Sequence, residues 1–210
     1  VYATYQSCLD AVGGSLIGDL YIQQNNDYNA NVLGRGNRFD VLVYSGMIRD
    51  FSQDELRFVF GHELGHVLFE HSTVSVGRVL DSVDSLSEED VALLFRWSRA
   101  AEVSADRIGL LCCGKLSPAV TALFKTSSGL EGISETQILQ SFRTQYDTLV
   151  EHLAEKGDQH GWIRSHPMMP LRFKAIELAA LDVVALRNSA RNVSAQGFRS
   201  VDREIAELLE

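Results

Sequence analysis

The sequence predicts an α+β fold that is mainly helical, with a small three-stranded sheet beside one of the long helices. Strand-forming residues are concentrated in about residues 20–45, whereas helix-capping signals recur from residue 52 onward. The chain has 210 residues, of which 45% are hydrophobic, so it can bury a core without the help of disulfide bonds. We therefore expect residues 1–210 to form one domain.

Three short segments are expected to form the sheet: Leu20–Gln24, Ala30–Leu33 and Phe39–Tyr44. The third segment is rich in β-branched and aromatic residues, which favour strands. Residues 34–37 read Gly-Arg-Gly-Asn, and glycine and asparagine tolerate the positive φ of a tight turn, so we expect a hairpin there. Residues 7–18 could begin as a helix, although the pair Gly13-Gly14 disfavours it.

Two long helices are expected after the sheet. An S-x-x-E capping box at Ser52 predicts a helix over about residues 53–71. Ser87 precedes three acidic residues, which stabilise the first turn of a helix that we expect over about residues 88–113. Gly114 can end this second helix in the left-handed conformation.

The remainder, residues 117–210, is also predicted to be helical. A proline after Ser117 and a capping box at Ser134 mark two helix starts. Residues 157–170 are rich in loop-forming residues, and we expect a loop there. Two further helices are expected, over residues 171–186 and from about Val201.

Charge and cysteine content exclude several classes of function. The chain has 19 Lys and Arg against 28 Asp and Glu, a net charge of −9, which disfavours binding to nucleic acid or to an anionic membrane. Its three cysteines do not form a disulfide framework, so we expect a reducing compartment and a cytoplasmic location. No segment approaches the ~18 apolar residues of a membrane helix. Because the sequence begins at Val1, a targeting or anchoring segment could precede it.

The strongest chemical signal is His-Glu-Leu-Gly-His at residues 62–66. Positions four apart share one face of a helix, so His62 and His66 can bind one metal ion together. Zinc acidifies the water that it binds, and the adjacent Glu63 can take a proton from that water. Apolar residues surround this motif, and buried His and Glu side chains need partners that a metal supplies. We therefore predict one zinc ion per chain.

A catalytic zinc site needs a third protein ligand, and we predict Glu102 for this role. His71 is rotated by about 140° from His66 along a helix, and Glu70 would place three ligands in a row instead of around a tetrahedron. Glu102 lies on the second long helix, so it can approach from another side. Asp106 follows four residues later on the same face and can accept the free N–H of a zinc-binding histidine.

These motifs resemble those of the gluzincin metallopeptidases of the HtpX and CAAX-prenyl-protease type. The resemblance rests first on H-E-x-G-H at residues 62–66 and E-x-x-x-D at residues 102–106. Further matches are the pair Asn29-Ala30 in a hairpin, Gly46-Met47-Ile48, Asp54-Glu55-Leu56, and His166-Pro167 followed by Arg172. The resemblance implies a zincin-like fold. Many members carry membrane helices, which this chain lacks, so we expect a soluble member instead of one that cleaves membrane-embedded prenyl proteins.

The resemblance also implies roles outside the zinc helix. An exposed strand at Ala30–Leu33 would pair with an extended peptide or protein substrate, with Asn29, Ala30 and Asn31 in contact with it. His166 would polarise the scissile carbonyl or stabilise the oxyanion, or it is an ordinary loop histidine. Arg172 would hold this loop to the site by pairing with an acid, or it is a surface arginine.

The sequence therefore predicts a zinc-dependent endopeptidase in which Glu63 is the general base. The alternative is a latent or inactive module in which zinc is structural and residues 157–170 block the cleft. The presence of Glu63 disfavours this alternative, since a purely structural zinc site does not need a base beside its ligands.

Overall fold

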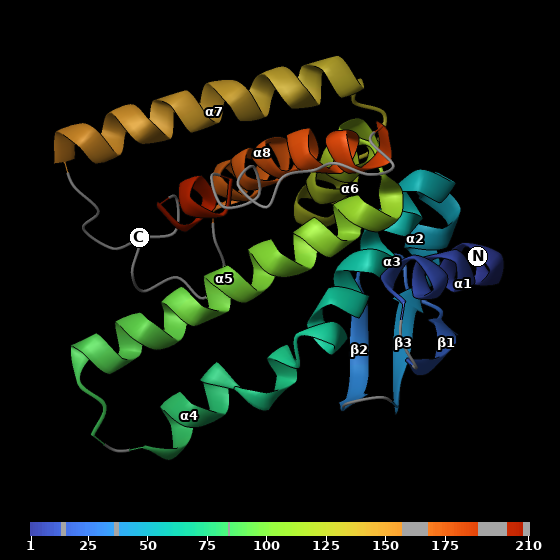
Figure 1. Cartoon of the computed structure of the whole chain (residues 1–210), viewed down its shortest axis with the longest axis horizontal. Coiled ribbons are helices and arrows are strands. Elements are labelled where there is room, and N and C mark those ends of the chain that lie inside the picture. The colour runs from blue at the N-terminus through green and yellow to red at the C-terminus, as the bar shows by residue number, and fades with distance from the viewer. Residues whose placement is uncertain (14–15, 36–37, 84, 157–167, 189–200, 208–210) are drawn as a thin grey trace.

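The computed structural model describes residues 1–13, 16–35, 38–83, 85–156, 168–188 and 201–207. The strands are β1 (Ile17–Gln23), β2 (Ala30–Arg35) and β3 (Arg38–Tyr44). The helices are α1 (Tyr2–Val12), α2 (Ser45–Asp50), α3 (Gln53–Leu68), the 3₁₀ turn η1 (His71–Thr73), α4 (Val76–Ser82), α5 (Glu88–Cys113), α6 (Leu116–Ser128), α7 (Glu135–Lys156) and α8 (Met169–Asn188). A small sheet beside α3 and a mainly helical remainder confirm the predicted fold class (Figure 1).

The sheet has the order β1-β3-β2. Strands β2 and β3 form the predicted antiparallel hairpin, whereas β1 runs parallel to β3. Alternate residues of β3 are buried beneath the helices, and these are Phe39, Val41 and Val43. Strand β2 forms one edge of the sheet and lies next to the zinc-motif helix α3 (Figure 1).

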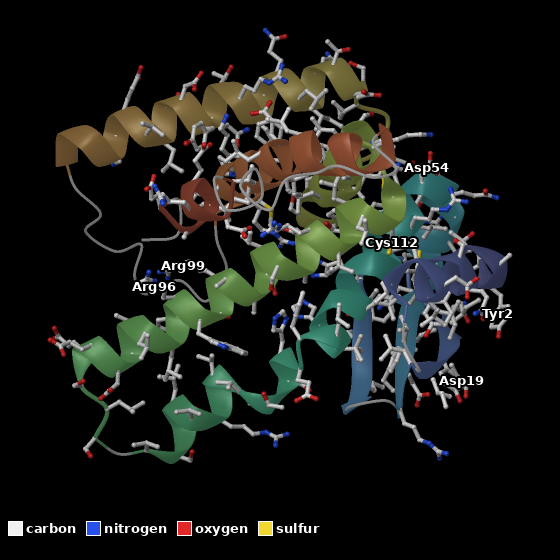
Figure 2. The ribbon with its side chains drawn as sticks, in the orientation of Figure 1. Tyr2, Asp19, Asp54, Arg96, Arg99 and Cys112 are labelled. Carbon is white, nitrogen blue, oxygen red and sulfur yellow. The ribbon has the colours of Figure 1, made fainter. Side chains whose placement is uncertain are left out.

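The two long helices α3 and α5 pack closely because small residues face each other. A Cβ atom on Gly65 would lie 2.7 Å from Cα of Ala105, and one on Gly61 would lie 2.8 Å from Cα of Gly109. Larger side chains at these positions would push the helices apart. Cys112 on α5 packs at the same contact, near α1 and α3 (Figure 2). The close approach matters for function because each of the two helices carries part of the candidate site.

Several helix ends agree with their sequence signals. The capping box at Ser52 starts α3, and Ser87 caps α5 together with Asp90. Gly114 ends α5 with φ 72° and ψ 10°, the left-handed conformation that glycine favours. Helix α7 begins after Ser134, whose hydroxyl accepts the Gln137 N–H at 3.4 Å. Residues 201–207 are helical, as predicted.

Other boundaries correct the sequence predictions. Helix α1 begins at Tyr2, earlier than residue 7, where the sequence suggested that a helix could begin, and it ends before Gly13, in line with the glycine pair that disfavours a longer helix. Helix α3 ends at Leu68 and not near residue 71, because Glu70 turns into the left-handed region with φ 52° and ψ 37°. The prediction did not include the short helices α2 and α4.

Two later helices begin earlier than predicted. Helix α6 starts at Leu116 and not at Ser117-Pro118, which is compatible with proline because N–H groups throughout the first turn lack helical partners. Helix α8 starts at Met169 and not at Leu171. The predicted loop 157–170 and His166 fall largely outside the described residues. Among the helices that the structure describes, none is both long and apolar enough to cross a membrane.

Candidate metal centre

Helix α3 determines where the zinc-motif side chains point. Its start is fixed by a reciprocal cap, in which the Ser52 N–H donates to Glu55 at 2.6 Å and the Glu55 N–H donates to Ser52 at 3.3 Å. Buried Glu55 also pairs with Lys125 of α6 at 3.0 Å. From this anchored start the helix continues without interruption, so His62 and His66 face the same way, towards α5.

Three potential ligand atoms converge between α3 and α5. Nε2 of His62 and Nε2 of His66 are 3.1 Å apart. The two carboxylate oxygens of Glu102 lie 3.8 Å from His62 Nε2 and 3.7 Å from His66 Nε2. Bonds of 2.0–2.2 Å in a tetrahedral zinc site separate the ligand atoms by about 3.4 Å. The three side chains therefore match zinc in both chemistry and spacing.

A buried ion-pair network supports His62. Asp106 is fully buried, and its Oδ1 lies 2.9 Å from Nδ1 of His62. Arg172 of α8 donates to both carboxylate oxygens of Asp106, at 2.8 and 2.6 Å, and also lies 3.2 Å from Glu102. Arg172 therefore pairs with an acid, and this contact ties α8 to the centre. Arg172 orients Asp106, and Asp106 in turn holds the His62 ring so that its Nε2 faces His66 and Glu102.

The electrostatic effect of this network is visible in the pKa values of its members. Burial would raise the pKa of Asp106, but the adjacent Arg172 guanidinium holds it below its ordinary value. Burial would lower the pKa of His62, but the hydrogen bond and the charge of Asp106 raise it. Asp106 thus stays ionised, which makes the His62 imidazole a stronger base towards a metal.

His66 is supported by His71, to which the sequence assigned no role. Nδ1 of His66 lies 2.9 Å from Nδ1 of His71, and Nε2 of His71 lies 3.3 Å from the hydroxyl of Ser104. That hydroxyl donates to the carbonyl of Ala101 at 2.9 Å. When Nε2 of His66 binds a metal, its proton is on Nδ1 and is donated to His71, whose own proton is then donated to Ser104. A consistent chain of donors and acceptors results.

His71 reaches this position through the left-handed turn at Glu70, which brings the chain back over the end of α3. Its ring also packs edge-on against Trp97 of α5, at 5.9 Å between ring centroids. A histidine five residues after the second motif histidine was the available sequence signal. A continuous helix, however, would point this histidine away from His66.

Glu63 lies beside the ligands and is buried enough to change its acidity. Burial raises its pKa to about 7, and the nearby charge of Glu102 adds to this effect. The positive influence of Arg172 and a backbone hydrogen bond from Val32 of β2 oppose it in part. A carboxylate with a pKa near neutrality can take up and release a proton under physiological conditions.

The centre opens into a cavity of about 510 Å³. Asn29, Ala30 and Asn31, predicted to contact substrate, all line this cavity, together with Glu63. The Tyr44 N–H donates to the Asn29 carbonyl at 3.0 Å, so Asn29 and Tyr44 form a hydrogen-bonded residue pair. Hydrogen-bonded and non-hydrogen-bonded residue pairs alternate along an antiparallel ladder. The N–H and C=O groups of Ala30, Val32 and Gly34 therefore point to the open edge of β2, towards the cavity.

Comparison with known proteins gives an independent result. The sequence profile of Peptidase family M48 matches residues 5–86 and 76–180. Plastoglobule-localized metallopeptidase 48, chloroplastic, from Arabidopsis thaliana is 28% identical over 180 residues, which cover 76% of this chain and 51% of the relative. Metalloendopeptidase OMA1, mitochondrial, from Bos taurus is 28% identical over 129 residues, 49% of this chain and 24% of the relative.

The chain thus spans about half the length of the first relative and about a quarter of the second. No solved structure matches significantly. The names of the two relatives refer to the chloroplast and the mitochondrion, so they give no support to the cytoplasmic location expected from the sequence, which stays a prediction.

Proposed function

Since the chain belongs to Peptidase family M48, we propose that it is a zinc-dependent endopeptidase with one zinc ion held by His62, His66 and Glu102. The observation that carries the proposal is the convergence of these three side chains within 4.8 Å of one another, with the carboxylate of Glu63 beside them. Three protein ligands leave a fourth position for water or substrate, which is typical of catalytic zinc sites.

When bound, zinc would polarise the scissile carbonyl and make a water molecule acidic enough to attack it near neutral pH. Glu63 takes a proton from the attacking water and later delivers it to the leaving amine. Glu63 lines the cavity together with His62, His66 and Glu102, so its carboxylate can reach the attacking water.

The remaining polar residues hold the ligands in place. Arg172 orients Asp106, and Asp106 fixes the tautomer and the direction of His62. His71 does the same for His66 by accepting its Nδ1 proton. The proposed role of His166, to polarise the scissile carbonyl, concerns a residue outside the described part of the chain and remains a sequence-based proposal.

An extended peptide is the substrate that the cavity fits best. The open edge of β2 offers backbone groups of Ala30 and Gly34, and the carbonyl of Val32, which can pair with a substrate strand, whereas the Val32 N–H donates to Glu63. Among the described residues that line the cavity, none is Lys or Arg, so these walls offer no cation to bind a terminal carboxylate. This favours cleavage within a chain over removal of a C-terminal residue.

The test combines zinc content with cleavage of an unfolded protein such as casein. The zinc-loaded chain should cleave it, whereas Glu63→Gln should bind zinc equally and lose most of the hydrolysis, since glutamine cannot accept the proton. Equal cleavage by both proteins would exclude Glu63 as the base. Zinc binding without cleavage by either protein would instead indicate the latent module with a structural zinc.

A further inference from the structure

Two of the three cysteines lie against each other in the core, although they are far apart in the sequence. The thiol of Cys112 on α5 lies 3.9 Å from the carbonyl oxygen of Cys8 on α1, and it is also within hydrogen-bond reach of the Cys8 sulfur. Both residues are buried, and all three cysteines are free thiols. Of the residues that the structure describes, those that form the metal centre and its cavity include no cysteine.

The pair lies at the point where α1 packs onto the two helices of the metal centre, as the position of Cys112 in Figure 2 shows. The Cys8 thiol donates to the carbonyl of Arg57 on α3 at 3.6 Å. A Cβ atom on Gly61 would lie 2.9 Å from the Cys112 sulfur, so this sulfur packs against the residue that precedes His62. A covalent bond between the two sulfurs would therefore fasten α1 to α5 beside the zinc-motif helix.

Cys8 is suited to react first with an oxidant. The hydrogen bond from Cys112 and the positive charge of Arg57 hold the pKa of the Cys8 thiol below its ordinary value, although burial opposes them. The thiolate is the form of cysteine that reacts, and Cys112 is already in place as the second thiol.

The packing of α1 gives an oxidant a route to the pair. The buried residues of this helix are Thr4, Tyr5 and Cys8, so one narrow face holds it to the core. A helix held in this way can open locally without unfolding of the whole domain. Hydrogen peroxide is little larger than water, so a brief opening admits it to the Cys8 sulfur.

We propose that Cys8 and Cys112 form a reversible disulfide bond when the protein meets a peroxide, and that this bond fastens α1 to the helices of the metal centre. The Cys8 thiolate attacks one peroxide oxygen, so that an S–O bond forms and the O–O bond breaks with loss of hydroxide. The Cys112 sulfur then attacks the Cys8 sulfur, so that the S–S bond forms and the S–O bond breaks. The two thiol protons and the two hydroxide ions leave as water, and peroxide accepts the two electrons that the thiols lose.

The first experiment maps the bond in the zinc-loaded chain. The protein is treated with hydrogen peroxide, free thiols are blocked, and the unreduced protein is digested with trypsin for mass spectrometry. No Lys or Arg separates Cys112 from Cys113, so one peptide contains both, and the variants assign the bond. Cys113→Ala is the matched control and should keep the link to the Cys8 peptide, because the Cys113 thiol is also buried but donates to the carbonyl of Lys115 at 3.3 Å. Cys8→Ala and Cys112→Ala should lose the link.

A bond from Cys8 to Cys113, or a folded protein in which peroxide links no cysteines, would overturn the proposal. The readout needs no peptide cleavage, so it is independent of the proposed peptidase function.

The second experiment measures what the bond does to the fold. It joins residues 104 positions apart and so restricts the unfolded chain. The midpoint of urea unfolding should therefore be at least about 1 M higher for the oxidised chain than for the reduced chain. A reducing thiol should restore the lower midpoint, and Cys8→Ala should show no rise after the same treatment. An unchanged or lower midpoint in a chain that carries the bond would mean that the bond does not fasten α1 in place.

Discussion

The two histidines of the candidate metal centre lie four residues apart on one helix, yet they are supported in different ways. His62 contacts an ionised carboxylate, Asp106, which Arg172 of α8 holds in place. His66 contacts an uncharged partner, His71, which belongs to the turn that follows α3. The first support joins three helices that are far apart in the sequence. The second joins α3 to the residues that come directly after it and then to Ser104 of α5.

The difference appears in the acidity of the two rings. The pKa of His62 is raised, since Asp106 favours its charged form more than burial disfavours it. Burial and the neighbouring His62 lower the pKa of His66 to about 3. Two residues of the same type on the same helix face therefore differ because Asp106 offsets burial at His62, whereas burial and the charge of His62 prevail at His66. We infer that the His62 side carries most of the electrostatic support, and that the His66 side provides mainly orientation.

The largest expected effect comes from a substitution that affects His62 and His66 together. Glu102→Ala removes the proposed third ligand, whose carboxylate lies near both histidines, so zinc affinity should fall by more than about 100-fold, beyond the usual loss for a residue that supports a ligand indirectly. The helix itself should persist, because alanine is the best helix former. Chelator competition measures the affinity, and exposed Glu89→Ala in the first turn of α5 is the control. An unchanged affinity would remove α5 from the metal site.

Asp106→Asn removes the charged partner of His62 and leaves the contact of His66 with His71 unchanged. Zinc affinity should fall 10–100-fold, less than for Glu102→Ala, because Asp106 orients a ligand without touching the metal. The zinc-free protein should lose about 3 kcal/mol in urea unfolding, since the change leaves the buried Arg172 guanidinium without its main partner. The control is the ion pair at the surface between Arg107 of α5 and Asp202 of the helical residues 201–207, where Asp202→Asn should cost at most about 1 kcal/mol.

If Asp106→Asn reduced zinc affinity more than Glu102→Ala, the roles of ligand and support would be reversed. If it left the stability of the zinc-free protein unchanged, the network around Arg172 would not contribute to folding. In that case the contrast between the two histidines would concern the metal alone.

The sequence predicted that Asp106 supports His62, but it did not predict that His71 supports His66. The spacing of His62 and His66, and a later carboxylate pair at Glu102 and Asp106, follow from helical periodicity within single elements. The capping signals at Ser52 and Ser87 fixed where those helices begin. Such signals are local, so they can be recognised without knowledge of the tertiary structure.

The contribution of His71 could not be predicted in this way. It depends on the end of α3 at Leu68 and on the left-handed conformation of Glu70, a residue type that rarely adopts it. The contact of His71 with Ser104 joins residues 33 positions apart, and the pair of Arg172 with Asp106 joins residues 66 positions apart. Periodicity within one helix contains no information on such contacts. Arg172 could be anticipated only through the family resemblance.

Glu63 lies between the two histidines in the sequence, and its raised pKa predicts a pH-dependent cost in the zinc-free protein. Its pKa is about 7 in the folded chain, above its ordinary value of 4.5, so folding becomes less favourable as pH rises from about 4.5 to about 7. Glu63→Gln should therefore raise the free energy of unfolding by about 1–3 kcal/mol at pH 8 and by little at pH 4.5. Urea unfolding of zinc-free protein at both pH values measures this.

Glu70→Gln is the matched control for this experiment, since Glu70 is exposed and lines the same cavity. It should change the stability little at either pH. An equal gain for Glu63→Gln at pH 4.5 and pH 8 would mean that the effect does not come from ionisation, and that the charge of Glu63 is well compensated in the folded chain.

The smallest expected effect comes from replacing His71, the partner of His66. In His71→Phe the ring shape is roughly kept but the acceptor for the His66 Nδ1 proton is lost, so zinc affinity should fall about tenfold, the lower end of the range for indirect support. His71→Asn should recover part of this loss, because its amide can accept from His66 and donate to Ser104. Stability should change by less than about 1.5 kcal/mol, since only hydrogen bonds between neutral groups are lost. The ¹⁵N shifts of His66 report whether its proton stays on Nδ1. Equal zinc affinities of His71→Phe and His71→Asn would mean that His71 only fills space. A loss of zinc affinity as large as that of Asp106→Asn would show that an imidazole supports a zinc ligand as strongly as a carboxylate does.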